Sequence, residues 1–600
     1  KTEAMARRIA WWHGMDGVPK DRIVAFTFTE RAAEEMKFRV RRFMSAISPD
    51  GDDPSLGGMY VGTIHSYCLN QLRALWPQEF HNDEIVDDVA RYALVQQGFN
   101  YTLGLHSLQS ALGAGRPYPP SRADTIDYFL TAYDLLNEYN HLQVHLPVAP
   151  RPEFGHEAEW CKGAELAEPV GDGDVAEAFS SCAAKYYAYL RCRHFLDFST
   201  SQSELVRRLD ADTAKLAELR SSTTHLVIDE VQDVNQVQDD LRRLIIGSNG
   251  HLTAVGDHRQ AIYGFRGGRV DLMADLAAEV HAATDGEMLE MTANYRSTSR
   301  IVDVSNRWNT TIDPPAAMSA TSMIPGRVTR TDADPTHVMT VGFDDREDEA
   351  LWIAESIQGL VEGDQGAFHD TRGGSRGITY SDIGVLVRSS TDARTYQEAL
   401  RIAGIPAVVR AGPDLFAQPE VLLFASALYV SVGRDDFPRS TWNKRTIGNR
   451  LEDELGVATP SARDAIPAAY DRLTREGLPV PDGAAERLLL VADAIAGRMT
   501  GDRIGADVLA SVKDEGLRDF LRGRRDVRRV FPQTVYQWLL AEGAVSGWDD
   551  ESHRGQTAMF HLGQLSGLVT GIETPGWSSP SGFRYQVQSL MLWASKQASP

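Results

Sequence analysis

Three continuous apolar runs, each followed by polar residues, limit most strongly what this chain can fold into. The runs are Ile23 to Phe28, Leu226 to Ile228 and Leu252 to Val255. Continuous apolar runs are typical of strands that are buried on both faces, as in parallel sheets. Thr29, Asp229 and Gly256 stand at their carboxyl ends, where open α/β sheets bind ligands. The pattern therefore predicts an α/β lobe with a ligand site at one edge of its sheet.

The chain of 600 residues is too long for a single core, so several domains are expected. Helical periodicity dominates the stretch between the first two runs, roughly Leu69 to Asp197, which we interpret as an insertion into the first lobe. A second α/β lobe is predicted from near Met288, with strands at Val338 to Phe343 and Ile383 to Val387. From about Gly433 to Pro580 the pattern is helical again and predicts a second insertion.

Charge and cysteine content restrict the partners and the compartment. The formal net charge of −22 argues against a uniformly basic nucleic-acid binder, but a local basic groove can bind independently of the net charge. The four cysteines form no C-x-x-C pair and are too few for a disulfide scaffold, which favours a reducing, cytoplasmic location. The longest apolar run, Val421 to Val432, is too short to cross a bilayer, so no membrane partner is expected.

The residues after the second run form the strongest chemical motif, Asp229 to Asp233. An aspartate at the end of a buried strand can hold the shell of a bound Mg²⁺ ion. An adjacent glutamate, here Glu230, can orient and deprotonate a water molecule. The alternative is that these acidic residues only begin a helix, where the helix dipole favours them. An acidic pair alone is moderate support, whereas the full five-residue motif is far more specific for the first interpretation.

A glycine-rich loop follows the third run. Gln260 comes shortly after the strand end, where its amide could sense the γ-phosphate of a nucleotide. Tyr263, Phe265 and Arg266 stand just beyond it and suit base stacking and phosphate contact. The alternative is that both aromatic residues belong to a core, which the flanking glycines and arginine disfavour.

Two further segments are candidates for phosphate contact. Arg296 precedes a predicted helix and could act as an arginine finger, although a surface salt bridge is the commoner role of a single arginine. The chain opens with Lys1 and Thr2, which match the end of a phosphate-binding loop, G-x-x-x-x-G-K-[ST]. In such a loop the lysine contacts the β- and γ-phosphates and the hydroxyl binds Mg²⁺. From these two residues alone, a chance terminus is the simpler interpretation.

Five motifs occur in the order found in the UvrD/Rep/PcrA helicases of superfamily one, and the chain resembles that family over nearly its whole length. The motifs are Thr27 to Ala33, Gly62 to Ser66, Asp229 to Asp233, Gly256 to Gly268 and Asn294 to Ser297. The resemblance implies an α/β fold with two RecA-like P-loop motor lobes, the second incomplete, each carrying a mainly helical inserted subdomain. The implied boundaries are 1–68 and 197–287 for the first lobe, 69–196 for its insertion, 288–432 for the second lobe, 433–585 for its insertion and 586–600 for a return toward the second lobe.

The resemblance also implies roles for particular residues in binding ATP, Mg²⁺ and DNA. For ATP and Mg²⁺ these are Lys1 and Thr2 at the end of the Walker loop, Thr2 and Asp229 at Mg²⁺, Glu230 at the attacking water, Gln260 and Arg296 at the γ-phosphate, and Tyr295 on the adenine. For DNA these are Phe28, Tyr263 and Phe265 stacked on bases, Thr63, His65 and Arg266 near the strand, and Ile447 and Gly448 near the duplex backbone.

Three substitutions depart from the family pattern. Glu3 stands where an arginine usually covers adenine, and Glu30 stands where asparagine is usual beside the DNA. Thr446 replaces the first glycine of a G-I-G element. The last two family motifs, which supply a ribose contact and a second arginine, are not found before Pro600. The resemblance therefore leads us to expect a chain cut at both ends, which hydrolyses ATP very poorly as given.

The implied function is an ATP-dependent DNA helicase that moves 3′ to 5′ on single-stranded DNA and unwinds duplex, in DNA repair or replication restart. Its expected partners are single-stranded DNA, junctions of single- and double-stranded DNA, and repair proteins. Two alternatives stay open: the helicase subunit of a recombination helicase–nuclease, and a DNA-binding paralogue that does not translocate. Glu3 and Glu30 are the only support for the paralogue.

Overall fold

The computed structural model divides into two compact units, each built from more than one segment of the chain. Lys1–Val86 and Gly98–Met339 form the first unit, and Asp87–Gln97 and Thr340–Pro600 form the second. The structure describes residues 1–47, 56–139, 142–147, 157–247, 250–262, 264, 268–312, 321–326, 338–363, 367–369, 375–388, 390–407, 413–437, 446–527, 530–545, 547–548, 552–572, 583–584 and 586–591.

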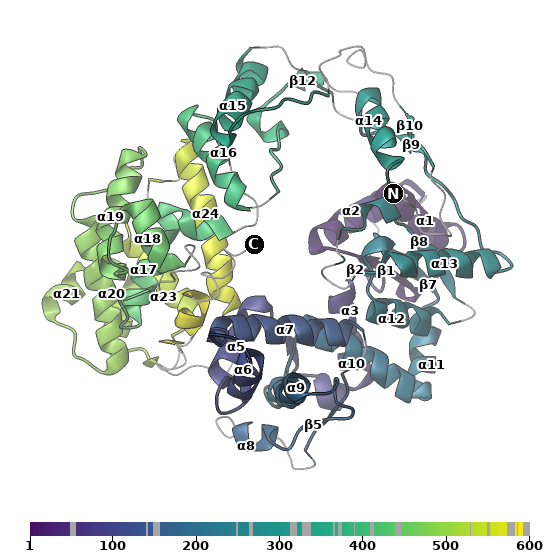
Figure 1. Ribbon diagram of the computed structural model, residues 1–600, viewed down its shortest axis with the longest axis horizontal. Helices are drawn as coiled ribbons and strands as arrows, with labels where there is room; N and C mark the ends of the chain where they lie inside the picture. Colours follow the sequence, from purple (N-terminus) through teal and green to yellow (C-terminus); the bar gives the residue numbers. More distant parts are fainter. Residues whose placement is uncertain are drawn as a thin grey trace. The chain divides into compact units, whose positions relative to one another are not determined.

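A four-stranded parallel sheet lies within the first unit (Figure 1). Its strands, in spatial order, are β2 (Tyr60–Thr63), β1 (Ile23–Thr27), β7 (His225–Ile228) and β8 (His251–Ala254). Three of these strands coincide with the apolar runs, so the prediction of a parallel sheet is confirmed. The register aligns Thr27 with Thr63 and Phe26 with Ile228, which brings the carboxyl ends of the strands to one edge.

The strand β1 is buried on both faces because helices cover the sheet from either side. Ile23 and Ala25 pack into one cluster with α1 and α2, whereas Val24 and Phe26 pack into the other with α3, α10 and α12. This alternation follows from the two-residue period of a strand, and burying each such large apolar side chain contributes roughly 1.5–3 kcal/mol. The helices are α1 (Thr2–Gly14), α2 (Glu30–Ile47), α3 (Ile64–Leu75), α10 (Phe198–Ala211), α11 (Thr213–Ser222), α12 (Gln236–Ile246) and α13 (Val270–Ala282).

The chain between α3 and α10 consists mainly of helices in the part that the structure describes. Aromatic rings of Phe129, Tyr133 and Tyr186 pack edge to face between α7 and α9. The segment Asp87–Gln97, which holds most of α5, belongs instead to the second unit, where Val89 joins the helical core. The elements are α4 (Pro77–Phe80), β3 (Glu84–Ile85), α5 (Asp88–Gly98), α6 (Leu105–Gly113), α7 (Arg122–Glu138), β4 (Val144–His145), α8 (Glu157–Cys161), β5 (Glu165–Leu166), α9 (Asp174–Cys192) and β6 (Phe195–Leu196).

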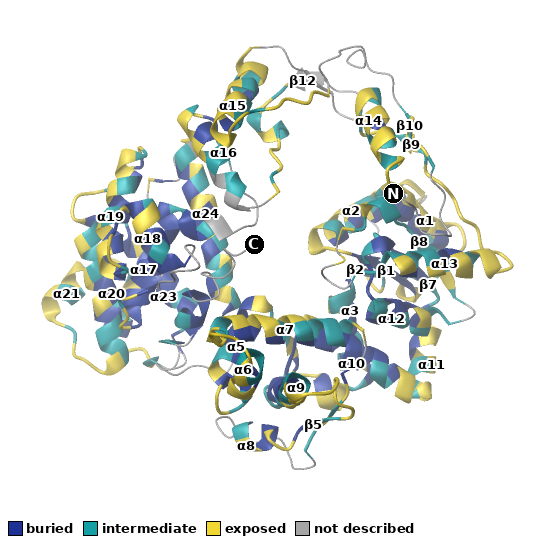
Figure 2. Ribbon diagram, viewed as in Figure 1, coloured by how far each residue is buried: buried dark blue, intermediate teal, exposed yellow. Residues whose placement is uncertain are grey.

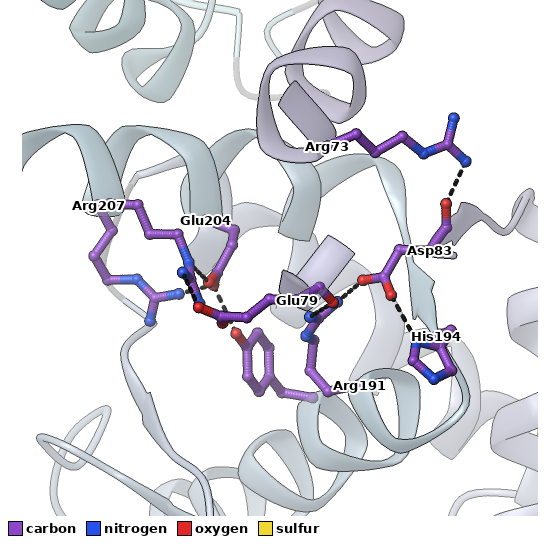
Figure 3. Close-up of polar contacts among 9 residues, drawn as sticks. Arg73, Glu79, Asp83, Arg191, His194, Glu204 and Arg207 are labelled. Atoms are coloured by element: carbon purple, nitrogen blue, oxygen red, sulfur yellow. Dashed lines mark hydrogen bonds and ion pairs between the residues drawn. The ribbon is translucent and has the colours of Figure 1, made fainter. Parts of the chain in front are cut away.

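A buried carboxylate joins the beginning and the end of this helical segment (Figure 3). Asp83, fully buried just before β3, forms an ion pair with Arg191 near the end of α9. His194 Nδ1 lies 3.0 Å from the other carboxylate oxygen. Burial lowers the pKa of Arg191 to about 10, so the guanidinium stays charged at neutral pH. Because breaking a buried ion pair costs roughly 3–5 kcal/mol, this contact holds the outgoing and returning segments together.

The predicted second lobe contains few strands in the described residues. β9 (Ala293–Asn294) and β10 (Ile324–Pro325) pair in parallel beside α14 (Ser299–Asn309), all in the first unit. In the second unit, α15 and α16 pack together around Ala350, Ile357 and Leu400. The remaining elements of this region are α15 (Arg346–Glu362), the antiparallel pair β11 (Ala367–His369) and β12 (Ser375–Gly377), and α16 (Ser390–Ile402).

The strands predicted at Val338 to Phe343 and Ile383 to Val387 are wrong. Neither run has a strand partner among the described residues, and several of their apolar side chains are exposed, with Leu386 at 98%. A strand forms only where a neighbour satisfies its backbone N–H and C=O groups. An apolar run therefore indicates where a strand could form, but the run alone does not supply the partner.

The apolar run Val421 to Val432 forms the central helix of the second unit rather than a surface element. Every residue of α17 is buried, and Figure 2 shows it as dark blue. A helix that is apolar all round needs neighbours on every side, and α18, α19, α20, α23 and α24 provide them. Among the described helices, none combines the length and apolar character of a membrane span. The helices are α17 (Pro419–Ser431), α18 (Ile447–Leu455), α19 (Ala462–Arg475), α20 (Ala484–Thr500), α21 (Ala506–Ser511), α22 (Glu515–Leu521), α23 (Pro532–Glu542) and α24 (His553–Gly571).

Candidate functional site

Polar residues gather at the carboxyl edge of the parallel sheet in the first unit. Asp229 and Glu230 follow β7, and Asp257 follows β8. A backbone hydrogen bond of 3.1 Å, from the N–H of Val231 to the carbonyl of Val255, joins the two segments. Each segment leads into a short 3-10 turn, η2 (Val231–Asp233) and η3 (His258–Gln260). Two motifs that are separate in the sequence therefore lie side by side.

The first turn of α1 faces the acidic residues of this edge. Lys1 Nζ lies 3.3 Å from Glu230 Oε2, and both side chains are partly exposed. Burial raises the pKa of Asp229, the adjacent charge of Glu230 raises it further, and the ammonium of Lys1 opposes both. Thr2 is the first residue of α1, next to Lys1. The structure thus brings the predicted residues Lys1, Asp229 and Glu230 together, with Thr2 beside them in the chain.

The oxygen ligands at this edge of the sheet are too few to hold Mg²⁺ unless a bound phosphate supplies others. Among the described residues, no group of three or more His, Cys, Asp or Glu side chains is placed to hold a metal ion. Mg²⁺ usually binds through one or two carboxylates together with waters and substrate phosphates. Asp229 has one carboxylate oxygen bonded to the backbone N–H of Glu230 at 2.9 Å, which leaves the other for a cation. Asp229 is therefore a candidate Mg²⁺ ligand that a bound phosphate would have to supplement, and among the described residues no hydrogen bond joins the Thr2 hydroxyl to it.

The backbone of Glu230 is held in an uncommon conformation. Its φ of 49° and ψ of 48° lie in the left-handed region, which costs energy for any residue other than glycine. Such strain persists only where the surroundings impose it, and it is concentrated at functional sites. Here the neighbouring residues impose it, because Asp229 N–H donates to the carbonyl of Phe26 at 3.0 Å and Val231 N–H is bonded to Val255.

Gln232 connects the two segments from inside, and sequence reasoning did not predict it. The residue is 2% exposed. Its Nε2 donates to Glu230 Oε2 and to Asp233 Oδ2, each at 3.0 Å. Its Oε1 accepts the backbone N–H of Asp257 at 2.9 Å. Gln260, a predicted site residue, donates in turn from Nε2 to Asp257 Oδ2 at 2.8 Å.

A second polar cluster lies where β1 and β2 end. Thr63 caps α3 by accepting the N–H of Ser66 at 3.4 Å. The Thr63 hydroxyl lies 2.8 Å and the Ser66 hydroxyl 3.2 Å from the same oxygen of Glu30, the first residue of α2. A hydroxyl has one proton to donate, and a carboxylate is its strongest acceptor here. Glu30 therefore accepts a hydrogen bond from each hydroxyl, so the two hydroxyl oxygens can only accept further hydrogen bonds.

Exposed aromatic rings belong to the same edge. Phe28 is 43% exposed and Phe198 is 37% exposed, and the ring of His65 packs edge-on against Phe198 with centroids 5.0 Å apart. Burial lowers the pKa of His65 to about 4, although the charge of Glu30 opposes the shift, so the imidazole is neutral at pH 7. Exposed flat rings suit stacking on bases. Phe198 was not predicted as a site residue.

Tyr295 and Arg296 follow β9 and do not share these contacts. Asn294 Oδ1 accepts the backbone N–H groups of Arg296 at 3.0 Å and of Ser297 at 2.9 Å, which shapes the turn before α14. Tyr295 is 62% exposed, and Arg296 is exposed as well. Among the described residues, no hydrogen bond or ion pair joins the Arg296 side chain to Glu230.

The other predicted residues lie elsewhere. Tyr263, Phe265 and Arg266 fall outside the described residues. Ile447 and Gly448 begin α18 in the second unit, and both are buried, Ile447 completely. Thr446, which replaces the family glycine, caps this helix by accepting the N–H of Asn449 at 3.3 Å. A contact between α18 and a DNA backbone would therefore have to use main-chain groups at the start of the helix.

Comparison with known proteins places two family matches on the chain. Residues 1–281 match the UvrD/REP helicase N-terminal domain, and residues 289–459 match the UvrD-like helicase C-terminal domain. The ATP-dependent DNA helicase UvrD1 of Mycobacterium tuberculosis is 28% identical over 551 residues, which are 88% of this chain and 62% of that protein. DNA helicase II of Escherichia coli is 25% identical over 533 residues, 86% of this chain and 64% of that protein. The chain spans less than two thirds of the length of either relative.

Proposed function

The chain belongs to the UvrD/REP helicase family, and from this premise we propose that it is the motor of an ATP-dependent DNA helicase. The motor moves 3′ to 5′ on single-stranded DNA and unwinds duplex in DNA repair or replication restart. The observation that carries the proposal is the strained, partly exposed Glu230, held beside Asp229 by Lys1 and by the buried Gln232. Strand displacement by the full-length protein, on duplexes with a 3′ or a 5′ single-stranded tail, tests it. Displacement by that protein only from the 5′ tail, or none with either, would overturn it.

In this proposal, ATP binds and is hydrolysed at the carboxyl edge of the parallel sheet. Lys1 would contact the β- and γ-phosphates of ATP, and Thr2 and Asp229 would hold Mg²⁺, which neutralises charge on the phosphates. Glu230 would accept a proton from the attacking water. Gln260 and Arg296 would contact the γ-phosphate, and Tyr295 would stack on the adenine.

The strand would lie along the ends of β1 and β2. Phe28 and Phe198 offer exposed rings there, and the neutral His65 and the Thr63 hydroxyl lie between α2, α3 and α10. Tyr263 and Phe265 would stack on bases and Arg266 would lie near the strand, and the start of α18 at Ile447 and Gly448 would contact duplex. Stacking tolerates every base, and a translocating motor needs that tolerance.

Only one of the two substitutions that supported a non-translocating paralogue is paired with a cation. Glu3 accepts a hydrogen bond of 2.6 Å from Arg7 and lies 4.0 Å from Arg39, and the bond from Arg7 lowers the pKa of Glu3. Glu30 accepts hydrogen bonds from the hydroxyls of Thr63 and Ser66, which are neutral groups. Glu3 therefore gives the paralogue no support, whereas the carboxylate of Glu30 stays a charge beside the proposed strand. ATP hydrolysis by the full-length protein, measured with and without single-stranded DNA, separates the motor from the paralogue.

Phe28→Ala is expected to weaken binding of single-stranded DNA by about 1–3 kcal/mol, or roughly 5- to 150-fold in Kd, on different base sequences alike. The reason is the loss of one stacked base at an exposed ring. Phe38→Ala is the matched control, because Phe38 is 63% exposed within α2 and is not one of the stacking candidates. Fluorescence anisotropy with labelled oligonucleotides measures both. Equal affinities for wild type and Phe28→Ala would remove Phe28 from the DNA site.

Glu30→Gln is expected to raise the affinity for single-stranded DNA about fivefold, which corresponds to roughly 1 kcal/mol for one charge near a phosphate at a solvated site. The carboxamide can accept from Thr63 while its NH₂ group donates to a phosphate. The slope of log affinity against log salt should also steepen by up to about 0.7. Glu34→Gln removes the same charge from a more exposed position of α2, where Glu34 pairs with Lys37. If both variants bind single-stranded DNA equally tightly, the gain in affinity comes from the change in net charge and not from the position of Glu30.

A further inference from the structure

Both protons and the oxygen of the Gln232 carboxamide form hydrogen bonds, and these partners determine the orientation of the amide. The NH₂ group has two protons, and two carboxylates, Glu230 and Asp233, accept them. The carbonyl oxygen faces a backbone N–H, that of Asp257, which can only donate. A rotated amide would place its NH₂ against that N–H and its oxygen against two carboxylates. The side chain therefore has one arrangement that satisfies every group.

The packing around this carboxamide is tight. Gly256 comes directly before Asp257, and a Cβ at Gly256 would lie 2.9 Å from Gln232 Oε1 and 2.7 Å from Val231 Cγ1. Contacts this short do not occur for real side chains, so glycine is needed for the close approach. A shift of the Gly256–Asp257 backbone would therefore push directly on Gln232.

The bonds form a continuous path between two parts of the site. Glu230 is bonded to Gln232, Gln232 to the backbone of Asp257, and the carboxylate of Asp257 to Gln260. The first residue of the path is the proposed base for water, and the last is the proposed contact to the γ-phosphate. The segment that follows Gln260 in the sequence is the one predicted to contact DNA.

We propose that Gln232 is a positioning residue that couples Glu230 to the Asp257–Gln260 turn, so that nucleotide binding and single-strand binding strengthen one another through it. This inference rests on the proposed function. Movement of the turn when the strand binds shifts the carboxamide, and the carboxamide carries Glu230 Oε2 with it. The same path works in reverse, because coupling between two binding equilibria is reciprocal.

Other residues would not serve at this position. Glutamate would place a third carboxylate against Glu230 and Asp233 and would lose both donated bonds. Asparagine is one methylene shorter and cannot span both sides. Methionine has a similar length and fills the space, but it leaves the N–H of Asp257 and the two carboxylates without this partner. Gln232→Met therefore removes the path with the least change in volume.

The experiment measures the Kd for single-stranded DNA with and without a non-hydrolysable ATP analogue, in wild type, Gln232→Met, Gln232→Glu and a control. The control is Gln236→Met, because Gln236 is a half-buried glutamine that bonds Asp240 and Arg269, neither of which belongs to the site. Melting temperature and the Kd for the analogue alone are measured on each protein. In wild type, the Kd for DNA without the analogue divided by the Kd for DNA with the analogue is expected to lie between about 5 and 150.

Gln232→Met and Gln232→Glu are expected to bring that ratio below about 3, with the Kd for the analogue alone within about threefold of wild type, and Gln236→Met should keep the wild-type ratio. A role in stability alone would lower the melting temperature and leave the ratio unchanged, which would overturn the inference. Equal loss of the ratio in Gln236→Met would overturn it too. If the analogue does not change the DNA affinity of wild type, the proposed function is overturned together with this inference. If Gln232→Met keeps the wild-type ratio, the inference alone is overturned.

Discussion

In the full-length protein, Glu230→Gln is expected to lower the rate of single-strand-stimulated ATP hydrolysis by about 10²- to 10⁴-fold, the usual contribution of a positioned general base. Glutamine has nearly the shape of glutamate, and its carbonyl oxygen can still accept the hydrogen bond from Gln232, so the fold and the affinity for ATP should be retained. It cannot accept a proton from water, and the chemical step is therefore lost. Steady-state turnover and ATP affinity, measured on one preparation, check both parts.

The control for this variant is Glu34→Gln, which removes an equal charge from α2 and should leave turnover within about threefold, as surface substitutions usually do. A Glu230→Gln protein that hydrolyses ATP near the wild-type rate contradicts the role of Glu230 as base. Loss of ATP affinity together with turnover would show instead that Glu230 serves nucleotide binding through its contact with Lys1.

In the full-length protein, Arg296→Ala is expected to reduce turnover by about 10³- to 10⁵-fold, the range of an arginine finger in phosphoryl transfer. In the described residues no carboxylate pairs with the Arg296 side chain, so the alternative role in a surface salt bridge has no support there. Arg296→Lys should recover only a small part of the rate, because an ammonium lacks the planar pair of donors that fits a phosphate. Turnover at saturating ATP and DNA, with ATP affinity beside it, measures the effect.

The matched control is Arg300→Ala, which removes an exposed arginine from α14 a few residues further along. Its turnover should stay within about threefold of wild type. Equal losses in the two variants would point to damage of the turn before α14 and not to a lost phosphate contact.

β1 and β7 were predictable because a strand that is covered on both faces is apolar at nearly every position. β1 has five buried residues, and β7 repeats this pattern after its first residue. β2 gave no such signal, since Gly62 and Thr63 make up half of it. The glycine is required by packing, because a Cβ there would lie 2.7 Å from the Tyr60 hydroxyl oxygen. The wrongly predicted strand at Ile383 to Val387 shows the opposite case, an apolar run without a neighbour to pair with.

The acidic centre of the site could be predicted because its residues are adjacent in the chain. Asp229 and Glu230 need only the end of one buried strand to be placed together. The contacts of Gln232 could not be predicted, because its carbonyl oxygen accepts the backbone N–H of Asp257, which follows the neighbouring strand β8. The same holds for Glu30, whose partners Thr63 and Ser66 come from another strand and helix. Such pairs depend on sheet register, which no local pattern contains.

The segment Asp87–Gln97 also affects how the chain is made and how it can be divided. It follows the first unit's β3 in the sequence but contributes Val89 to the helical core of the second unit. During synthesis Val89 therefore leaves the ribosome long before the rest of this core, from Phe416 onward, has been made. Contacts between such distant parts of a chain slow folding, and an apolar side chain that still lacks its partners is open to non-native association. A boundary drawn at Met339 for separate expression would leave this helix in the wrong half.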